Sequence, residues 1–582
     1  MGVISGFRRL FGLFNRRQRV NSVIMLGLIA VGGVVETIGI GLILPFTTAL
    51  LDQESIRRYP VLEAILQLPW IGSYSRFIVF MCVGLIIVFV LKSLYMFFLI
   101  YVQNRFTLNR QVELSKMLFS SYMNKPYEFF FSANTAQLQR NVNVLVAGVI
   151  QGILMSGLQM LTELLVVAFI LALLLIVDPI STLAVGAALG GVAALYYFFL
   201  KNRLDESAKR QIVYGASMVK TVNEGLGSIK DVKTLGREES FLAKYESSGR
   251  GYAKTAAFHN LAYQSPRLLI EAVAVSGLVL IVAINALRTP DLSASLPSIA
   301  LFGMAAIRIM PSMNRSLALL TNIRFSVTHL NEIFDDLKEA GESSAVQGWQ
   351  QPQAEKLNFA DCIEVRDVAY RYPGTNQDIL KNVQLTIKKG QIIGIVGSSG
   401  AGKTTLIDIL LGLLPPIRGE VLVDGVNINS NISSFRQSVG YVPQDIHMID
   451  DTICANVAFG VPPEKADLDR VWASLEIANL MEYVQALDEK LDTAVGEGGV
   501  RLSGGQRQRI GIARAMYGNP EILVFDEATS SLDNESEKII SDAIMAIGQT
   551  KTMIIIAHRL NTLDKCDVIY EIKNSELRTG EL

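Results

Sequence analysis

Six apolar stretches dominate the first 330 residues of this 582-residue chain. A helix of about 20 apolar residues crosses the hydrocarbon core of a bilayer, which is about 30 Å thick. The pattern predicts six membrane-spanning helices, and an even number leaves both chain ends in one compartment. The stretches, with the single charge that interrupts each of the first three, are 20–51 (Glu36), 77–104 (Lys92), 141–177 (Glu163), 179–200, about 252–287 and about 296–323.

Polar, helix-compatible sequence separates the second span from the third and the fourth from the fifth. These are residues 105–140 and 201–251, and the second carries ten Lys and Arg residues. Basic loops stay on the cytoplasmic side of a membrane. Residues 1–19 alternate arginines with aromatic and aliphatic residues, which is typical of an interfacial amphipathic helix. We therefore expect a transmembrane domain over 20–338 whose helices extend into the cytoplasm.

A polar segment without apolar periodicity, residues 339–358, predicts a linker. Beyond it, short β-branched runs alternate with helical patterns, which indicates an α/β domain over 359–582. The predicted fold is a membrane α-helical bundle of six spans, with long intracellular extensions, fused to an α/β domain.

Composition supports a membrane protein and excludes two other classes. Half of the residues are hydrophobic and only 18% are charged, below the quarter that is usual in soluble proteins. The formal charge of −1 gives no basic field for nucleic acid. The four cysteines are far apart, which argues against disulfides and a zinc site.

A phosphate-binding loop follows the apolar run 392–396. The pattern G-x-x-x-x-G-K-[ST], in a strand–loop–helix context, surrounds phosphates with backbone N–H groups. The lysine reaches the β- and γ-phosphates, and the first threonine is a ligand for Mg²⁺. The predicted nucleotide-binding residues are Gly397, Ser398, Ser399, Gly400, Ala401, Gly402, Lys403, Thr404 and Thr405.

Two further motifs complete the predicted ATPase site. The apolar run 522–525 ends in Asp526, which can bind Mg²⁺, and Glu527, which can polarise an attacking water. A second anion site is expected at a helix N-terminus, at Ser503, Gly504, Gly505 and Gln506.

With these motifs in this order, the chain resembles an ABC transporter, and the run 502–506 resembles the family signature. The resemblance implies that the signature of one subunit closes on the ATP bound by the phosphate loop of another. It also implies roles for four residues: Tyr372 stacks on adenine, Gln444 senses Mg²⁺ and the membrane domain, Asp533 lies in the D-loop, and His558 is the switch at the γ-phosphate. Gly498 stands where many exporters have arginine, which puts one coupling salt bridge in doubt.

One membrane domain and one cassette resemble a half-transporter of the type IV exporter class. The resemblance implies ATP and Mg²⁺ as cofactors and a homodimer, because an ATP sandwich needs two cassettes. It further implies a bacterial inner membrane location with both termini and the cassette in the cytoplasm. A membrane-anchored regulatory ATPase is the alternative of a different class.

Cations inside the spans are candidate substrate ligands, because intramembrane charges are costly and need a partner or a function. Arginine suits phosphate geometry. Pairing of Arg267 with Glu271 and snorkelling at helix ends are the alternatives. The candidates are Lys92, Arg267, Arg308 and Arg315.

The first span around 36–46, the outer segment 59–66 and these arginines resemble the bacterial lipid-linked oligosaccharide flippases. That resemblance implies ATP-driven flipping of a polyprenyl-pyrophosphate glycan, or a similar anionic lipid, to the outer leaflet. A multidrug exporter and a lipid A exporter remain alternatives.

Overall fold

The computed structural model describes residues 3–51, 73–177, 179–288, 296–346, 359–527, 544, 546–548, 550–556 and 566–579. The chain divides into two compact units. We call Met1–Lys125 with Ala133–Gly348 the membrane unit, and Pro126–Ser132 with Trp349–Leu582 the cassette unit. Asp533, His558 and the outer segment 59–66 lie outside the described residues.

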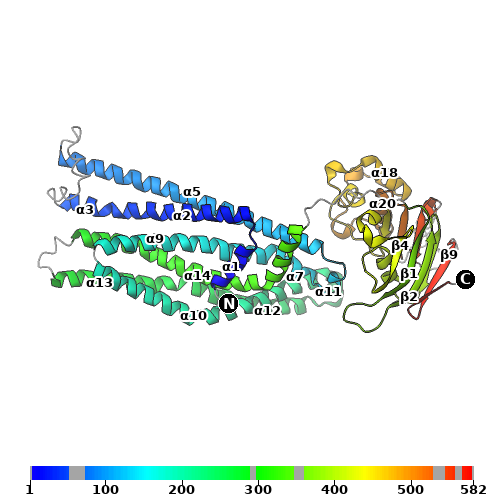
Figure 1. The fold of residues 1–582 in the computed structure, drawn as a ribbon, viewed down its shortest axis with the longest axis horizontal. Helices are drawn as coiled ribbons and strands as arrows, with labels where there is room; N and C mark the ends of the chain where they lie inside the picture. The colour runs from blue at the N-terminus through cyan, green and yellow to red at the C-terminus, as the bar shows by residue number, and fades with distance from the viewer. Residues whose placement is uncertain are drawn as a thin grey trace. The chain divides into compact units, whose positions relative to one another are not determined.

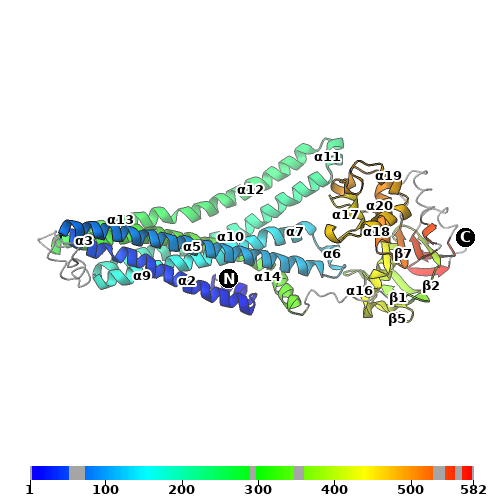
Figure 2. The same ribbon diagram turned by 90° about the horizontal axis from the view of Figure 1, so that it is seen from above.

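The membrane unit is a bundle of long helices that lie side by side (Figures 1 and 2). The helix α9 packs against both α2 and α14, and α10 pairs with α12. The elements are α1 (Val3–Gly12), α2 (Arg16–Gly41), α3 (Ile43–Leu51), α5 (Tyr74–Met123), α7 (Thr135–Arg140), η2 (Asn141–Leu145), α8 (Val146–Val149), η3 (Ile150–Met155), α9 (Ser156–Val177), α10 (Pro179–Gly227), α11 (Ile229–Leu235), α12 (Glu238–Gln264), α13 (Pro266–Arg288) and α14 (Leu296–Val346).

Within the described part of the chain, three segments are helical, long and apolar enough to cross a membrane: Arg16–Leu50, Tyr74–Met123 and Thr135–Ile176. They cover the first three predicted spans, apart from the last residue of the first and of the third. The fifth predicted span, 252–287, is divided, because α12 ends before Ser265 and α13 begins after it. The helix α14 continues to Val346, through the first part of the predicted linker.

Local sequence explains where two N-terminal helices lie. The side chain of Asn15 accepts a hydrogen bond from the Gln18 amide and the Gln18 side chain returns one, a capping box that starts α2. In α1, Leu10 is fully buried, and Arg9 bonds to Asn331 of α14. The apolar side of α1 therefore packs on the bundle.

In the described residues of the cassette unit, the strands form two sheets. The strand order is β2-β1-β4-β5 in the antiparallel sheet and β10-β9-β3-β8-β7-β6 in the other, whose strands from β9 to β6 are parallel. The strands are β1 (Cys362–Tyr370), β2 (Leu380–Lys388), β3 (Ile392–Gly397), β4 (Arg418–Val423), β5 (Val426–Asn427), β6 (Val439–Val442), β7 (Ile522–Asp526), β8 (Thr552–Ile556), β9 (Val568–Lys573) and β10 (Glu576–Thr579).

Helices cover these sheets and lie between the motifs. They are α15 (Lys403–Leu410), α16 (Ile432–Gln437), α17 (Ile453–Val457), α18 (Leu468–Ile477), α19 (Met481–Gln485) and α20 (Gly504–Tyr517), with 3-10 turns η5 (Ile428–Ser430), η6 (Pro463–Lys465), η7 (Lys490–Asp492) and η8 (Glu497–Gly499). The short helix α6 (Phe129–Ser132) also belongs to this unit, although its sequence neighbours belong to the membrane unit.

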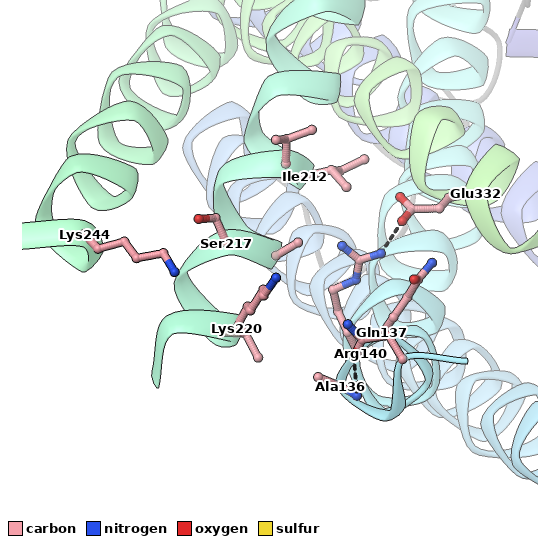
Figure 3. A pocket seen from close by; sticks show the side chains of 12 residues that line it. Ala136, Gln137, Arg140, Ile212, Ser217, Lys220, Lys244 and Glu332 are labelled. Carbon is pink, nitrogen blue, oxygen red and sulfur yellow. Dashed lines mark hydrogen bonds and ion pairs between the residues drawn. The ribbon is translucent and has the colours of Figure 1, made fainter. Parts of the chain in front are cut away.

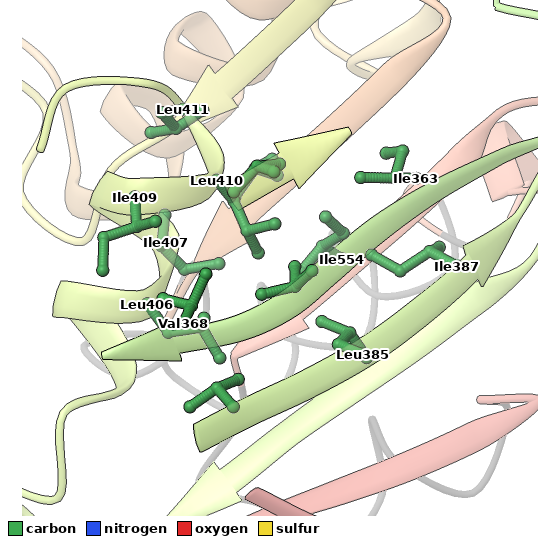
Figure 4. Packing of buried hydrophobic residues seen from close by; sticks show 14 of the residues in the cluster. Ile363, Val368, Leu385, Ile387, Leu406, Ile407, Ile409, Leu410, Leu411 and Ile554 are labelled. Atoms are coloured by element: carbon green, nitrogen blue, oxygen red, sulfur yellow. The ribbon is translucent and has the colours of Figure 1, made fainter. Parts of the chain in front are cut away.

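The apolar core of the cassette unit holds the phosphate loop in place. Every residue of β7 and β8 is buried, as expected for parallel strands that are covered on both faces. Leu406 and Leu410 of α15 pack with Val368 of β1 and Ile554 of β8 in one cluster (Figure 4). This packing fixes α15, and with it the loop that precedes the helix, against the sheet.

Candidate functional site

The phosphate loop connects β3 to α15 at the carboxyl end of a central parallel strand. Gly402 has a φ of 105°, a conformation that a side chain would strain, and a Cβ there would lie 3.0 Å from Ile379. The amine of Lys403 donates to the carbonyls of Gly397 (3.0 Å) and Ser398 (3.2 Å). The lysine therefore lies along its own loop, at the N-terminus of α15 where an anion binds.

The two predicted carboxylates lie at the carboxyl end of β7, where Asp526 is the last residue of the strand and Glu527 follows it; β7 is two strands away from β3 in the same sheet. Asp526 is 5% exposed, and burial, with the adjacent Glu527 as a second cause, raises the pKa of its carboxyl. Glu527 has a φ of 48°, which is rare for a residue with a side chain. Its Oε2 accepts a 2.8 Å hydrogen bond from the Gln444 amide.

These residues fit the triphosphate and Mg²⁺ that the motifs imply. The positive φ of Gly400 and Gly402 turns the backbone around the loop, and Lys403 supplies a cation there. Asp526 offers the buried carboxylate oxygens that Mg²⁺ prefers. Bound Mg²⁺ would neutralise charge on the phosphates, while Glu527 and Gln444 would orient a water.

Tyr372 lies beside the phosphate loop helix. Its hydroxyl and that of Thr405 are 2.9 Å apart and share a hydrogen bond. Its ring makes edge contacts with Tyr370, at 5.2 Å between ring centroids, and with Phe131 of α6, at 5.4 Å. The residue expected to stack on adenine is therefore held within an aromatic cluster.

The predicted second anion site forms the start of α20. Ser503 caps the helix: its hydroxyl accepts from the Gln506 amide (3.2 Å), and Gln506 accepts from the Ser503 amide (2.8 Å). The first amides of a helix have no intrahelical partner. Those of Gly504 and Gly505 thus remain at this end for an anion.

A buried carboxyl below the phosphate loop leads to a pH prediction. Burial, and secondarily the charge of Asp526, raises the pKa of Asp408 in α15 to about 6. The folded protein therefore disfavours ionised Asp408, and this cost is present above pH 6 and disappears as the pH falls toward 4.

We expect Asp408→Asn to increase the free energy of unfolding of the full chain at pH 8 by about 1 to 3 kcal/mol. A gain of that size raises the thermal unfolding temperature by a few degrees. The gain should shrink to about a third at pH 4.5, because Asp408 is then largely neutral in the folded protein, whereas the unfolded chain still ionises it down to about pH 4. Unfolding scans at both pH values test this. A lower unfolding temperature for the variant at pH 8 would contradict it.

The membrane unit contains a buried network of charged side chains contributed by four helices. Glu36 of α2 accepts from Lys92 of α5 (2.8 Å) and from Arg308 of α14 (2.6 Å). Glu163 of α9 pairs with Arg315 at 2.8 Å, and Arg308 lies 3.8 Å from it. We call these five residues the membrane ion network.

The network contains one more positive charge than negative charges. Its carboxylates are buried, with side-chain exposures of 3% for Glu36 and 9% for Glu163. Lys92 and Arg308 are mostly covered, whereas the Arg315 side chain is 61% exposed. The excess charge is therefore accessible at Arg315.

The fourth predicted cation lies apart from this network. Arg267 and Glu271 are both exposed on α13, and no ion pair joins them in the described part of the chain. Sequence reasoning noted Glu36 and Glu163 only as interruptions of spans. Isolated acids in apolar stretches that face isolated cations were the signal that could have identified them as partners.

A cavity of about 460 Å³ lies in the polar part of the membrane unit, between α7, α10, α12 and α14 (Figure 3). Its cations have carboxylate partners: Arg140 bonds to Glu332, and Lys244 and Lys220 contact Glu224. Lys220 and Lys244 are more than half exposed, so water screens their charges. The membrane ion network, with its buried carboxylates and its additional cation, is the stronger candidate for binding an anion.

Two family models match the chain. The model described as ABC transporter transmembrane region matches residues 23–264, and the model described as ABC transporter matches residues 380–530. The second range includes the phosphate loop, Gln444, the Ser503 motif and both carboxylates at the end of β7.

Curated relatives and a solved structure agree with these matches. The ATP-dependent lipid A-core flippase of Aromatoleum aromaticum is 31% identical over 466 residues, 78% of this chain and 74% of that protein. The protein of the same name from Bordetella avium is 33% identical over 375 residues, 63% of this chain and 61% of that protein. The structure of a bacterial Atm1-family ABC exporter with ATP bound has a TM-score of 0.75, covers 97% of this chain and 95% of its own, and is 20% identical, so it shows the shared fold.

Proposed function

This chain belongs to the ABC transporter family as a fused half-transporter, and we propose that two copies of it use ATP to flip an anionic amphiphile across a membrane. Family membership establishes that the chain binds ATP, hydrolyses it and couples hydrolysis to export. We propose three further points: which substrate is moved, that the second subunit is another copy of this chain, and how the chain is oriented in the membrane.

A homodimer with two composite sites is the assembly we propose. Each chain carries one phosphate loop and one Ser503 helix N-terminus, and both bind anions. ATP would lie between the phosphate loop of one copy and Ser503, Gly504 and Gly505 of the other. Glu527 would act as general base, with Gln444 beside it and with His558 and Asp533 in the roles that their motifs imply.

The excess positive charge of the membrane ion network carries the substrate proposal. An uncompensated charge in a membrane span is costly, so its retention favours a ligand of opposite sign. The headgroup would contact Arg315 first, with Arg308 and Lys92 behind it. The names of the relatives place them among lipid flippases, and the phosphates of a pyrophosphate-linked glycan lipid suit an arginine site.

The basic segments indicate the orientation of the chain in the membrane, and export as the activity of the family then gives the proposed direction of transport. Residues 201–251 carry ten Lys and Arg residues, so they would face the cytoplasm of a bacterium. The cassette and both termini would lie on the same side, with the chain in the inner membrane. The substrate would then move from the inner to the outer leaflet.

We expect Arg315→Gln to slow flipping of a fluorescent isoprenoid pyrophosphate in proteoliposomes by about tenfold or more, because the exposed charge-assisted contact is lost. The purified variant is reconstituted with ATP, and accessibility of the probe to a quencher is measured. Arg267→Gln, outside the network, is the comparison and should have a smaller effect.

Unchanged flipping by Arg315→Gln would refute the headgroup site. Failure of the wild-type protein to flip the pyrophosphate probe, with active flipping of lipid A or of a cationic drug, would replace the substrate class. Nucleotide-dependent binding of a partner without movement of any lipid would favour the regulatory ATPase.

A further inference from the structure

The carboxylate of Glu163 is held at both oxygens by one turn of α14. Its Oε2 accepts a 2.6 Å hydrogen bond from the Ser312 hydroxyl, and its Oε1 accepts a 2.8 Å bond from Nη1 of Arg315. Ser312 and Arg315 are three residues apart, so they lie on the same face of the helix. A group held at both ends cannot rotate about its terminal torsion without losing a bond.

Burial makes this attachment rigid. Ser312 is fully buried and Glu163 nearly so, and Arg308 approaches the same carboxylate. Pro311, inside α14, removes one backbone donor immediately before Ser312. The hydroxyl of Ser312 donates to Glu163, whereas the hydroxyl of Ser316, one turn later, donates to the backbone carbonyl of Ser312, four residues before it.

Arg315 differs from Lys92 and Arg308 because it is paired with a carboxylate and its side chain is still exposed. One guanidinium nitrogen contacts Glu163, yet most of the side chain is exposed. An unrestrained arginine loses much rotational freedom when it binds a ligand. An arginine already fixed by a buried carboxylate loses less, and it presents a planar donor pair to a phosphate.

We propose that Glu163 is a positioning residue: with Ser312 it fixes the guanidinium of Arg315 and thereby sets the preference for a pyrophosphate headgroup over a neutral one. This inference rests on the proposed function, since it concerns the same substrate site. It differs from a role in charge compensation, in which Glu163 only neutralises the arginines and the hydroxyl of Ser312 is immaterial.

The Ser312→Ala variant separates the two roles, because it removes one anchor of the carboxylate and keeps every charge. The dissociation constants of the full-length protein in nanodiscs are measured for a fluorescent isoprenoid pyrophosphate and for the same isoprenoid ending in an alcohol. We expect the preference for the pyrophosphate to fall about tenfold. A general loss of packing would weaken both lipids alike and leave the ratio unchanged.

Ser316→Ala is the matched control, since Ser316 is also buried in α14 but its hydroxyl donates to the Ser312 carbonyl. Its ratio should stay within about twofold of wild type, and Ser312→Thr, which keeps a hydroxyl, should restore the preference. For Glu163→Gln the two roles predict opposite changes in the preference for the pyrophosphate. If Glu163 positions Arg315, the preference becomes weaker, whereas if Glu163 only neutralises the arginines, it becomes stronger.

An unchanged ratio in Ser312→Ala, or an equal fall in Ser316→Ala, overturns the positioning role while the anionic substrate stands. A strengthened preference in Glu163→Gln overturns it as well. If the wild-type protein binds the isoprenoid alcohol and the isoprenoid pyrophosphate equally well, the proposal of an anionic substrate is wrong, and the positioning role with it.

Discussion

Glu527→Gln should lower ATP hydrolysis by a factor of about 100 or more while ATP binding is kept, because general-base catalysis contributes about that much. The glutamine retains the shape of the side chain and can still accept the bond from Gln444. Lys403, Thr404 and Asp526, which would hold the phosphates and Mg²⁺, are untouched. ATP turnover and binding of a fluorescent ATP analogue by the full-length protein give the two measurements.

Glu521→Gln is the matched control for this variant, since Glu521 precedes the same strand and lies at its opposite end. It should hydrolyse ATP near the wild-type rate. The glutamine at 527 should also hold the dimer closed on ATP, which crosslinking between cassettes would detect. Near-normal turnover by Glu527→Gln would remove Glu527 from the catalytic role.

Hybrid dimers of Lys403→Ala and Ser503→Arg chains should recover activity that neither parent has. In a homodimer of either variant, both composite sites are damaged. Lys403→Ala removes the phosphate-binding cation from each site, and Ser503→Arg places a bulky side chain in each site where Ser503 caps α20. In the hybrid, both lesions fall in one site and the other is intact. Hybrids purified through two different tags should show about half of the wild-type rate if the sites act independently.

Dimers in which both chains are Lys403→Ala, each with a different tag, are purified in the same way and give the baseline activity. Hybrids that stay at the baseline would exclude independent sites composed in trans. Full activity of a strictly monomeric preparation would contradict the dimer altogether.

The nucleotide motifs were predictable because each is a short contiguous segment. A phosphate loop is built from the backbone of neighbouring residues, so its geometry at Gly402 and Lys403 follows from local sequence. The contact between Gln444 and Glu527 joins residues 83 positions apart. The sequence did not predict this contact; the resemblance implied only that Gln444 senses Mg²⁺ and the membrane domain.

The membrane charges were not predictable in the same way. Lys92, Arg308 and Arg315 were candidates from the sequence and Glu36 and Glu163 only charges that interrupt spans, because the pairing of these residues depends on how the helices are rotated and offset. A uniformly apolar helix carries no periodic signal that fixes this rotation. Arg267 and Glu271 have the spacing of a pair, yet they form none in the described structure.

The seven residues Pro126–Ser132 have a practical consequence for experiments on fragments. They fold with the cassette unit, where Glu128 accepts a 2.8 Å bond from the Tyr370 hydroxyl and Phe131 contacts the ring of Tyr372. A cassette expressed from Trp349 onward would lack these contacts on Tyr370 and Tyr372, and Tyr372 also contacts Thr405 of the phosphate loop helix. Nucleotide affinities measured on such a fragment would describe a site whose tyrosines lack the neighbours that they have in the intact chain, and supplying the missing heptapeptide, by fusion or in solution, would restore those contacts.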